Sequence, residues 1–309
     1  MKSVYVINGF LESGKTEFLL FTIAQPYFQI KGKTLLILCE EGENEYDPAL
    51  LAKCRTELEL IEDQEDFNPS KLAELDKKHK PDRIIIEWNG MWNAKEMKLP
   101  WTWKVEQQIT TIDASTFPMY YTNMRSLLAE MIRKSEMIIF NRCDGIEELN
   151  VYKRNIKAVN ARAEIIFEGK DGEINEIFEE DLPYDVKQDV ISLKDDQYGI
   201  WYLDSMDHLE RYLGKTIEFT AMVLKPKEFP KGYFVPGRMA MTCCAEDIAF
   251  LGYACEYDGV DNLTQKEWVK VRATVAKEYW KDYQGEGPVL HAISVEKTKA
   301  PKEEVISFT

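Results

Sequence analysis

The sequence predicts an α/β protein: a doubly wound, mostly parallel sheet followed by a small β-rich domain, either an OB-like barrel or a sandwich. Up to about residue 190, short β-branched runs alternate with longer amphipathic stretches, as in strands linked by helices. Further along the chain, five β-rich segments follow one another with turn residues between them. The 309 residues are enough for two domains, and 45% of them are apolar, so each domain can bury a core.

The first part is predicted to contain six strands and four helices. The strand candidates are apolar enough to be covered on both faces, which is typical of parallel sheets; they span residues 3–7, 34–38, 83–87, 108–112, 137–140 and 164–167. The helical patterns between them span residues 15–25, 69–78, 116–134 and 146–160.

The second part is predicted to begin after a short helix-like stretch. Its strand candidates span residues 217–224, 237–244, 249–257, 268–278 and 289–297. We therefore expect a first, α/β domain at residues 1–203, a linker helix at 204–213 and a β-rich domain at 214–309.

Charge and cysteine content restrict the classes of partner. The chain has 39 Lys and Arg against 54 Asp and Glu, a net charge of −15, which disfavours a nucleic-acid partner held by a basic surface. Its six cysteines are too dispersed for the disulfide framework of a small secreted domain. No apolar run is long enough for a signal peptide or a membrane span, so we expect a cytoplasmic protein without direct membrane insertion.

The most specific motif is the segment from Gly9 to Thr16, which matches G-x-x-x-x-G-K-[ST] between a predicted strand and a predicted helix. Such a loop turns backbone N–H groups toward phosphates, while Lys15 supplies positive charge and the Thr16 hydroxyl can bind Mg²⁺. Glu12 is unusual in such a loop, since a carboxylate beside phosphates would repel them. The alternative interpretation of the whole segment is a purely structural glycine turn. The predicted nucleotide contacts here are Gly9, Glu12, Ser13, Gly14, Lys15, Thr16 and Glu17.

A second segment, Asn141-Arg142-Cys143-Asp144, follows the predicted strand 137–140 and resembles the Asn-Lys-x-Asp motif of GTPases. In that motif a carboxylate accepts hydrogen bonds from guanine groups that adenine lacks. Asp144 is therefore predicted to select guanine, Asn141 to tie the loop to its surroundings, and the stem of Arg142 to cover the base. A simple turn is the alternative reading of this short segment.

Acidic residues end two predicted buried strands. Glu87 ends one, while Glu40 and Glu41 follow the other. Oxygen ligands suit Mg²⁺, so Glu87 and one of Glu40 or Glu41 could bind the ion directly or through water, and one of the three, with Lys15, could serve GTP hydrolysis. Solvated acids at strand ends are the alternative. Asp113, at another strand end, is expected to be structural.

Together these segments resemble the CobW/HypB/UreG class of P-loop GTPases, particularly its CobW-like branch, over residues 2–180. The resemblance implies GTP or GDP and Mg²⁺ as ligands, a role in metal delivery to a receiving protein, and a homodimer as a candidate assembly. Three departures are present: the Cys-x-Cys-Cys metal motif of the branch is missing, Glu12 replaces a usual Gly, and Arg142 replaces Lys.

The second domain resembles the C-terminal part of an uncharacterised bacterial family encoded with predicted permeases, through residues 237–247 and 268–271. This resemblance makes a permease-associated protein a candidate partner. Cys243, Cys244 and Cys255 could hold Zn²⁺ or another transition metal if residues 242–246 form a turn, and buried, inert thiols are the alternative.

The leading hypothesis is therefore a Mg²⁺-dependent GTPase whose hydrolysis is coupled, through the second domain, to metal delivery or partner docking. A low-turnover, nucleotide-gated adaptor for a permease-like membrane partner is the second hypothesis. An ATP-dependent small-molecule kinase ranks last, because it leaves the Asn141–Asp144 segment unexplained.

Overall fold

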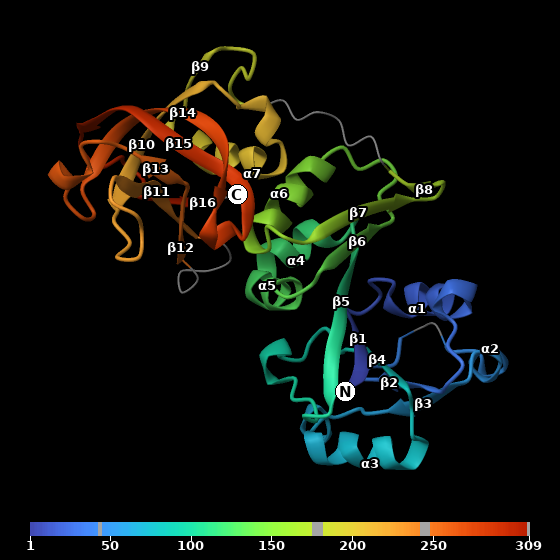
Figure 1. Ribbon diagram of the computed structural model, residues 1–309. Helices are drawn as coiled ribbons and strands as arrows, with labels where there is room; N and C mark the ends of the chain where they lie inside the picture. Colours follow the sequence, from blue (N-terminus) through green and yellow to red (C-terminus); the bar gives the residue numbers. More distant parts are fainter. Residues whose placement is uncertain (43–44, 175–181, 242–247, 308–309) are drawn as a thin grey trace. The chain divides into compact units, whose positions relative to one another are not determined.

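The chain divides into two compact units, Met1–Ile177 and Phe178–Thr309 (Figure 1). The computed structural model describes residues 1–42, 45–174, 182–241 and 248–307. The division lies before the linker helix predicted at 204–213. The helix observed in this region, α7 (Tyr198–Asp207), belongs to the second unit, because Tyr198 and Trp201 are fully buried in that unit's core.

The first unit contains a sheet of eight strands with β1 near its centre. The strand order is β3-β2-β4-β1-β5-β6-β7-β8, and every pairing is parallel except β7 with β8. The strands are β1 (Lys2–Asn8), β2 (Thr34–Leu38), β3 (Thr56–Leu60), β4 (Arg83–Glu87), β5 (Trp103–Asp113), β6 (Met137–Asn141), β7 (Glu164–Gly169) and β8 (Gly172–Glu173). All six predicted strands are present in this sheet.

Helices cover both faces of this sheet, which is the predicted doubly wound arrangement (Figure 1). One face packs against α1 (Lys15–Ala24) and α2 (Pro48–Lys53) through Leu19, Ile23 and Leu51. The other face carries α3 (Pro69–His79), α4 (Phe117–Asn123), α5 (Arg125–Ile132) and α6 (Leu149–Val159). The single helix predicted at 116–134 is two helices, because Met124 leaves the helical conformation with a φ of −131°.

The second unit contains a closed five-stranded barrel in which β10, β11, β13, β15 and β14 pair in turn and β14 returns to β10. Its strands are β10 (Thr216–Leu224), β11 (Tyr233–Met241), β13 (Ala254–Glu256), β14 (Trp268–Trp280) and β15 (Gly285–Lys297). Extra strands join it: β9 (Val190–Ser192) pairs with β10, while β12 (Ile248–Gly252) and β16 (Val305–Ser307) pair with β11. In β10 buried and partly exposed residues alternate, as expected when one face of a strand lines a core.

Seven short 3-10 segments complete the described elements, at Pro26–Phe28, Gln64–Asp66, Ala94–Glu96, Asp195–Gln197, Leu209–Arg211, Val260–Asn262 and Lys281–Tyr283. Within the described part of the chain, no helix is both long enough and apolar enough to cross a membrane.

Candidate functional site

The glycine-rich loop lies at the carboxyl end of β1, where an open α/β sheet binds its ligands, and leads directly into α1. The backbone is left-handed at Glu12 and Gly14, with φ values of +60° and +90°. A Cβ at Gly9 would lie 2.5 Å from the carbonyl oxygen of Thr111, and a Cβ at Gly90 would lie 2.2 Å from the carbonyl oxygen of Gly9. The loop therefore needs Gly9 for its own packing and Gly90, after β4, for its support.

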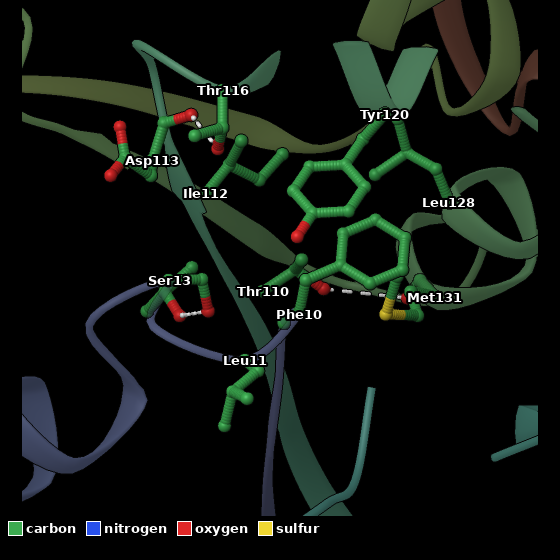
Figure 2. A pocket seen from close by; sticks show the side chains of 12 residues that line it. Phe10, Leu11, Ser13, Thr110, Ile112, Asp113, Thr116, Tyr120, Leu128 and Met131 are labelled. Carbon is green, nitrogen blue, oxygen red and sulfur yellow. Dashed lines mark hydrogen bonds between the residues drawn. The ribbon is translucent and has the colours of Figure 1, made fainter. Parts of the chain in front are cut away.

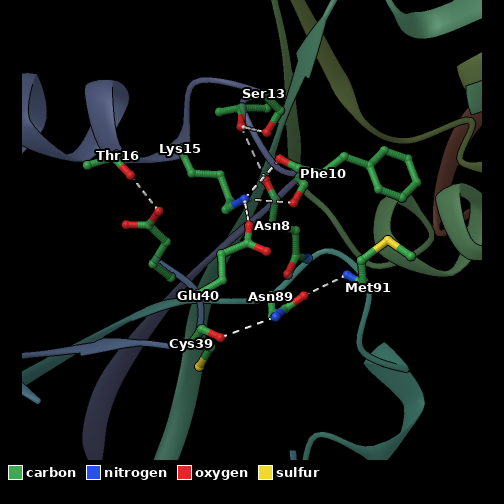
Figure 3. A network of polar contacts seen from close by, with 12 residues as sticks. Asn8, Phe10, Ser13, Lys15, Thr16, Cys39, Glu40, Asn89 and Met91 are labelled. Carbon is green, nitrogen blue, oxygen red and sulfur yellow. Dashed lines mark hydrogen bonds and ion pairs between the residues drawn. The ribbon is translucent and has the colours of Figure 1, made fainter. Parts of the chain in front are cut away.

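Lys15 reaches back beneath the loop (Figure 3). Its Nζ donates hydrogen bonds to the carbonyl oxygens of Gly9, at 3.0 Å, and Phe10, at 2.9 Å, and forms an ion pair with Glu40. The lysine is 3% exposed and the Glu40 side chain 11%. A buried ammonium group is tolerated here because all three of its N–H groups have acceptors.

Glu87, the last residue of β4, accepts hydrogen bonds from two hydroxyl groups. Thr16 donates to one carboxylate oxygen at 2.7 Å, and Tyr46 donates to the other. Glu87 is 2% exposed, and burial raises its pKa against the opposing effect of these hydrogen bonds. Tyr46 was not predicted. The sequence offered one signal for Tyr46, namely its position between the acids that follow β2 and Pro48, where α2 begins.

The loop after β6 is tied to the glycine-rich loop at two points. The Asn141 side chain donates to the carbonyl oxygen of Ser13 at 2.7 Å, and Arg142 donates to that of Glu12 at 3.0 Å. Asp144 is exposed, and both of its carboxylate oxygens accept from the backbone N–H of Lys170 at 3.1 Å. These contacts place the predicted base-reading segment beside the predicted phosphate loop.

A hollow lies between the glycine-rich loop, the strand ends and Arg142; Asn141 and Asp144 are not among its lining residues. Its lining comprises Leu11, Glu12, Gly14, Lys15, Thr16, Glu17, Glu40, Gly42, Glu87 and Arg142. Glu41 is exposed and does not line it, so Glu40 is the acid after β2 that the fold places beside Lys15. The Thr16 hydroxyl and the buried Glu87 carboxylate form an oxygen donor pair of the kind that Mg²⁺ prefers, so the residues present fit this ion.

A small, mostly apolar cavity lies on the other side of the glycine-rich loop (Figure 2). The ring of Phe10 stacks on that of Tyr120, with centroids 4.0 Å apart, and the Ser13 hydroxyl contacts that of Thr111 at 3.0 Å. These contacts fix the loop to β5 and α4.

The predicted cysteine site belongs to the second unit. Cys255 is fully buried in the barrel core, and burial raises the pKa of its thiol well above the ordinary value. Cys243 and Cys244 lie outside the described residues, so their role as metal ligands stays a prediction. Among the residues that the structure describes, no group of three or more His, Cys, Asp or Glu side chains is placed to hold a metal ion.

Comparison with known proteins gives matches for both units. The second unit matches the DUF1980 C-terminal domain over residues 170–306. A curated relative, the UPF0703 protein YcgQ of Bacillus subtilis (strain 168), is 26% identical over 117 residues. That match covers 37% of this chain and 40% of YcgQ, so the chain spans about two fifths of the relative's length.

Two solved structures are among the matches to the chain. The hydrogenase maturation factor HypB from Archaeoglobus fulgidus is 18% identical, with a TM-score of 0.41 and coverage of 56% of this chain and 84% of HypB. The Zn(II)-bound YjiA GTPase from E. coli is 20% identical, with a TM-score of 0.42 and coverage of 71% and 72%. At these scores the likenesses support no functional assignment.

The family match covers the unit that carries the hollow. The model of the CobW/HypB/UreG nucleotide-binding domain matches residues 3–167, more than half of the chain, including the glycine-rich loop, Glu87 and the Asn141–Asp144 loop. The chain therefore belongs to the CobW/HypB/UreG family.

Proposed function

We propose that this protein binds guanine nucleotides with Mg²⁺ and hydrolyses GTP. The observation that carries the proposal is the meeting of Lys15, Thr16 and Glu87 in one hollow, with the Asn141–Asp144 loop tied to the same glycine-rich loop. A structural glycine turn would not require a buried lysine and a buried carboxylate at its mouth.

Base selection is assigned to Asp144. Its carboxylate is exposed to a ligand and is oriented by the backbone N–H of Lys170. A carboxylate can accept from both the N1–H and the exocyclic amine of guanine, whereas adenine offers no such pair of donors. Because Lys170 already orients the carboxylate, its hydrogen bonds to guanine would cost little additional ordering.

Phosphate binding is assigned to the backbone amides of residues 9–16 and to Lys15. When bound, Mg²⁺ would neutralise charge that develops on the phosphates, and Thr16 and Glu87 are the residues that would hold it. Lys15 would exchange its ion pair with Glu40 for the phosphates. Glu40, left beside the phosphates, is assigned to hold the hydrolytic water.

The second domain is proposed to carry the output of the nucleotide cycle, either metal delivery to a receiving protein or docking on a permease-associated partner. The domain match over residues 170–306 and the adjacent cysteines at 243 and 244 support this role. We further propose a cytoplasmic protein, with a homodimer as a candidate assembly.

Phosphate release from GTP and from ATP, measured with Mg²⁺ and with EDTA, tests the proposal. We expect Mg²⁺-dependent release from GTP that falls about 100-fold or more in Lys15→Ala, because the buried cation among the described residues that line the hollow is lost. Lys33→Ala, on the surface of the same unit, is the matched control and should leave the rate unchanged. Binding of GTP without turnover would instead favour the nucleotide-gated adaptor, and release from ATP alone would contradict the guanine assignment.

A further inference from the structure

Arg142 connects three segments of the first unit. One guanidinium nitrogen donates both to the carbonyl oxygen of Glu12 in the glycine-rich loop and to the carboxylate of Asp113 at the end of β5. The Arg142 side chain is 49% exposed and also lines the hollow. A long, half-exposed arginine has many rotamers, so a fixed partner is needed to keep it at one place.

Asp113 is well placed to be that partner. Its register partner on β6 is Asn141, so the sheet sets Asp113 beside the residue that precedes Arg142. One carboxylate oxygen accepts from the backbone N–H of Ser115 at 2.8 Å and from the Ser115 hydroxyl at 2.6 Å, while the other faces Arg142. Figure 2 shows the Asp113 carboxylate at the rim of the apolar cavity, pointing away from it.

The electrostatics agree with this geometry. The Asp113 side chain is only 12% exposed, and this burial acts to raise its pKa. Its pKa nevertheless lies below the ordinary value, because Ser115 and Arg142 donate hydrogen bonds to the carboxylate. Asp113 is therefore a fixed anion, oriented from its own side by Ser115.

We propose that Asp113 is a positioning residue, which holds the Arg142 guanidinium at the mouth of the site and thereby strengthens guanine-nucleotide binding. The inference rests on the proposed function, since it concerns affinity at the same hollow. Lys15 and Arg142 are the two cations among the residues that line this hollow. Holding Arg142 in advance lowers the entropy cost of its contact with a nucleotide.

A double-mutant cycle on GDP affinity tests the proposal in the full chain. Fluorescence titration would give the dissociation constant for the wild type, Asp113→Asn, Arg142→Met and the double variant. Asparagine keeps the shape of Asp113 and an acceptor for Ser115 while removing the charge, and methionine keeps most of the Arg142 stem. We expect Asp113→Asn to weaken GDP binding about threefold to fivefold, which corresponds to the interaction free energy of a partly exposed ion pair. In the Arg142→Met background the same change should have no further effect.

Two further variants sharpen the result. Ser115→Ala should weaken GDP binding in the wild-type background only, and it tests the inference even if Asp113→Asn folds poorly. Glu106→Gln removes a carboxylate from the distant part of the same strand and should leave affinity unchanged. An equal loss from Asp113→Asn in both backgrounds would show a general role in the β5–α4 turn and would overturn this inference alone. Absence of guanine-nucleotide binding in the wild type would overturn the proposed function with it.

Discussion

At the scale of single residues, the hollow is organised by buried groups that satisfy one another. Glu87 is 2% exposed, and each of its carboxylate oxygens accepts one hydrogen bond. The Thr16 hydroxyl donates to one oxygen and the Tyr46 hydroxyl to the other. Removal of one donor leaves a buried carboxylate oxygen without a hydrogen-bond partner, which lowers the free energy of unfolding. Tyr46 therefore matters to the acid that we assign to the Mg²⁺ site.

Tyr46→Phe tests this role. The substitution removes only the hydroxyl, and we expect the free energy of unfolding to fall by about 1–3 kcal/mol because Glu87 loses one of its hydrogen bonds. In nucleotide titrations, the gain in GDP affinity that Mg²⁺ provides should shrink, while affinity in EDTA stays unchanged. Tyr152→Phe is the control, since Tyr152 is buried to a similar extent, 6% against 9%, on α6. Equal effects from the two variants in chemical denaturation and in titration would contradict the assignment.

The sequence predicted the site residues that belong to local motifs and missed those that act across the fold. The segment from Gly9 to Thr16 and the Asn141–Asp144 loop carry characteristic spacings, so their neighbourhood could be expected from strand ends alone. Tyr46 acts through its hydroxyl and Lys170 through its backbone N–H. Neither residue belongs to a motif with a characteristic spacing, so the sequence alone could not identify them. Asp113 was expected to be structural, whereas its contact with Arg142 shows only when β5 and β6 are placed in register.

At the scale of elements, the glycine-rich loop is held from below by the segment that follows β4. The backbone of Gly90 approaches that of Gly9 and Phe10 so closely that a Cβ would lie 2.2 Å from the Gly9 carbonyl oxygen and 2.7 Å from the Phe10 Cα. Both contacts are to backbone atoms, which cannot rotate away as a side chain could. The loop geometry thus depends on a residue about 80 positions away from it in the sequence.

We therefore expect Gly90→Ala to displace the glycine-rich loop, lowering GDP affinity at least about tenfold and destabilising the first unit by about 1–3 kcal/mol. Gly42→Ala is the matched control at the same hollow. A Cβ there would lie 3.4 Å from the Glu12 side chain, an ordinary contact with a group that can move. Calorimetric titration beside thermal unfolding would check both effects, and wild-type affinity in Gly90→Ala would refute the proposed support.

The elements that the sequence did not predict were missed for different physical reasons. In β3 the apolar residues alternate with Glu57 and Glu59, and the strand lies at the sheet edge, so it lacks the continuous apolar run of its neighbours. The helix α2 has only six residues, too few for a periodic pattern. The helix predicted at 116–134 ran through Met124 because no glycine or proline marks the position where the backbone leaves the helical conformation.

At the scale of the whole molecule, the division between the two units follows burial rather than the change in sequence texture. Tyr198, Trp201 and Tyr212 precede all five barrel strands, yet all three are at most 1% exposed in the barrel's core. β9 also adds to the barrel by pairing with β10. A β-rich texture begins only after these residues, so the sequence prediction places the start of the β-rich domain at residue 214.

Two fragments test this division. We expect residues 182–309 to unfold cooperatively and residues 214–309 to lack a cooperative transition. The shorter fragment loses three buried aromatic side chains, each worth about 3–5 kcal/mol, against a typical domain stability of about 5–15 kcal/mol. Thermal unfolding followed by circular dichroism distinguishes them, and equal transitions in both fragments would restore the later boundary.

The most direct test of the central claim is the base preference of the nucleotide site. Xanthine has a carbonyl oxygen where guanine has its exocyclic amine, so an asparagine amide at position 144 could donate to xanthine where Asp144 accepts from guanine. With GTP, ATP and XTP titrated into the full chain in Mg²⁺, the wild type should prefer GTP at least about tenfold over both others. Asp144→Asn should lose affinity for GTP and gain affinity for XTP. Equal wild-type affinities for GTP and ATP, with Asp144→Asn unchanged in all three titrations, would contradict the account.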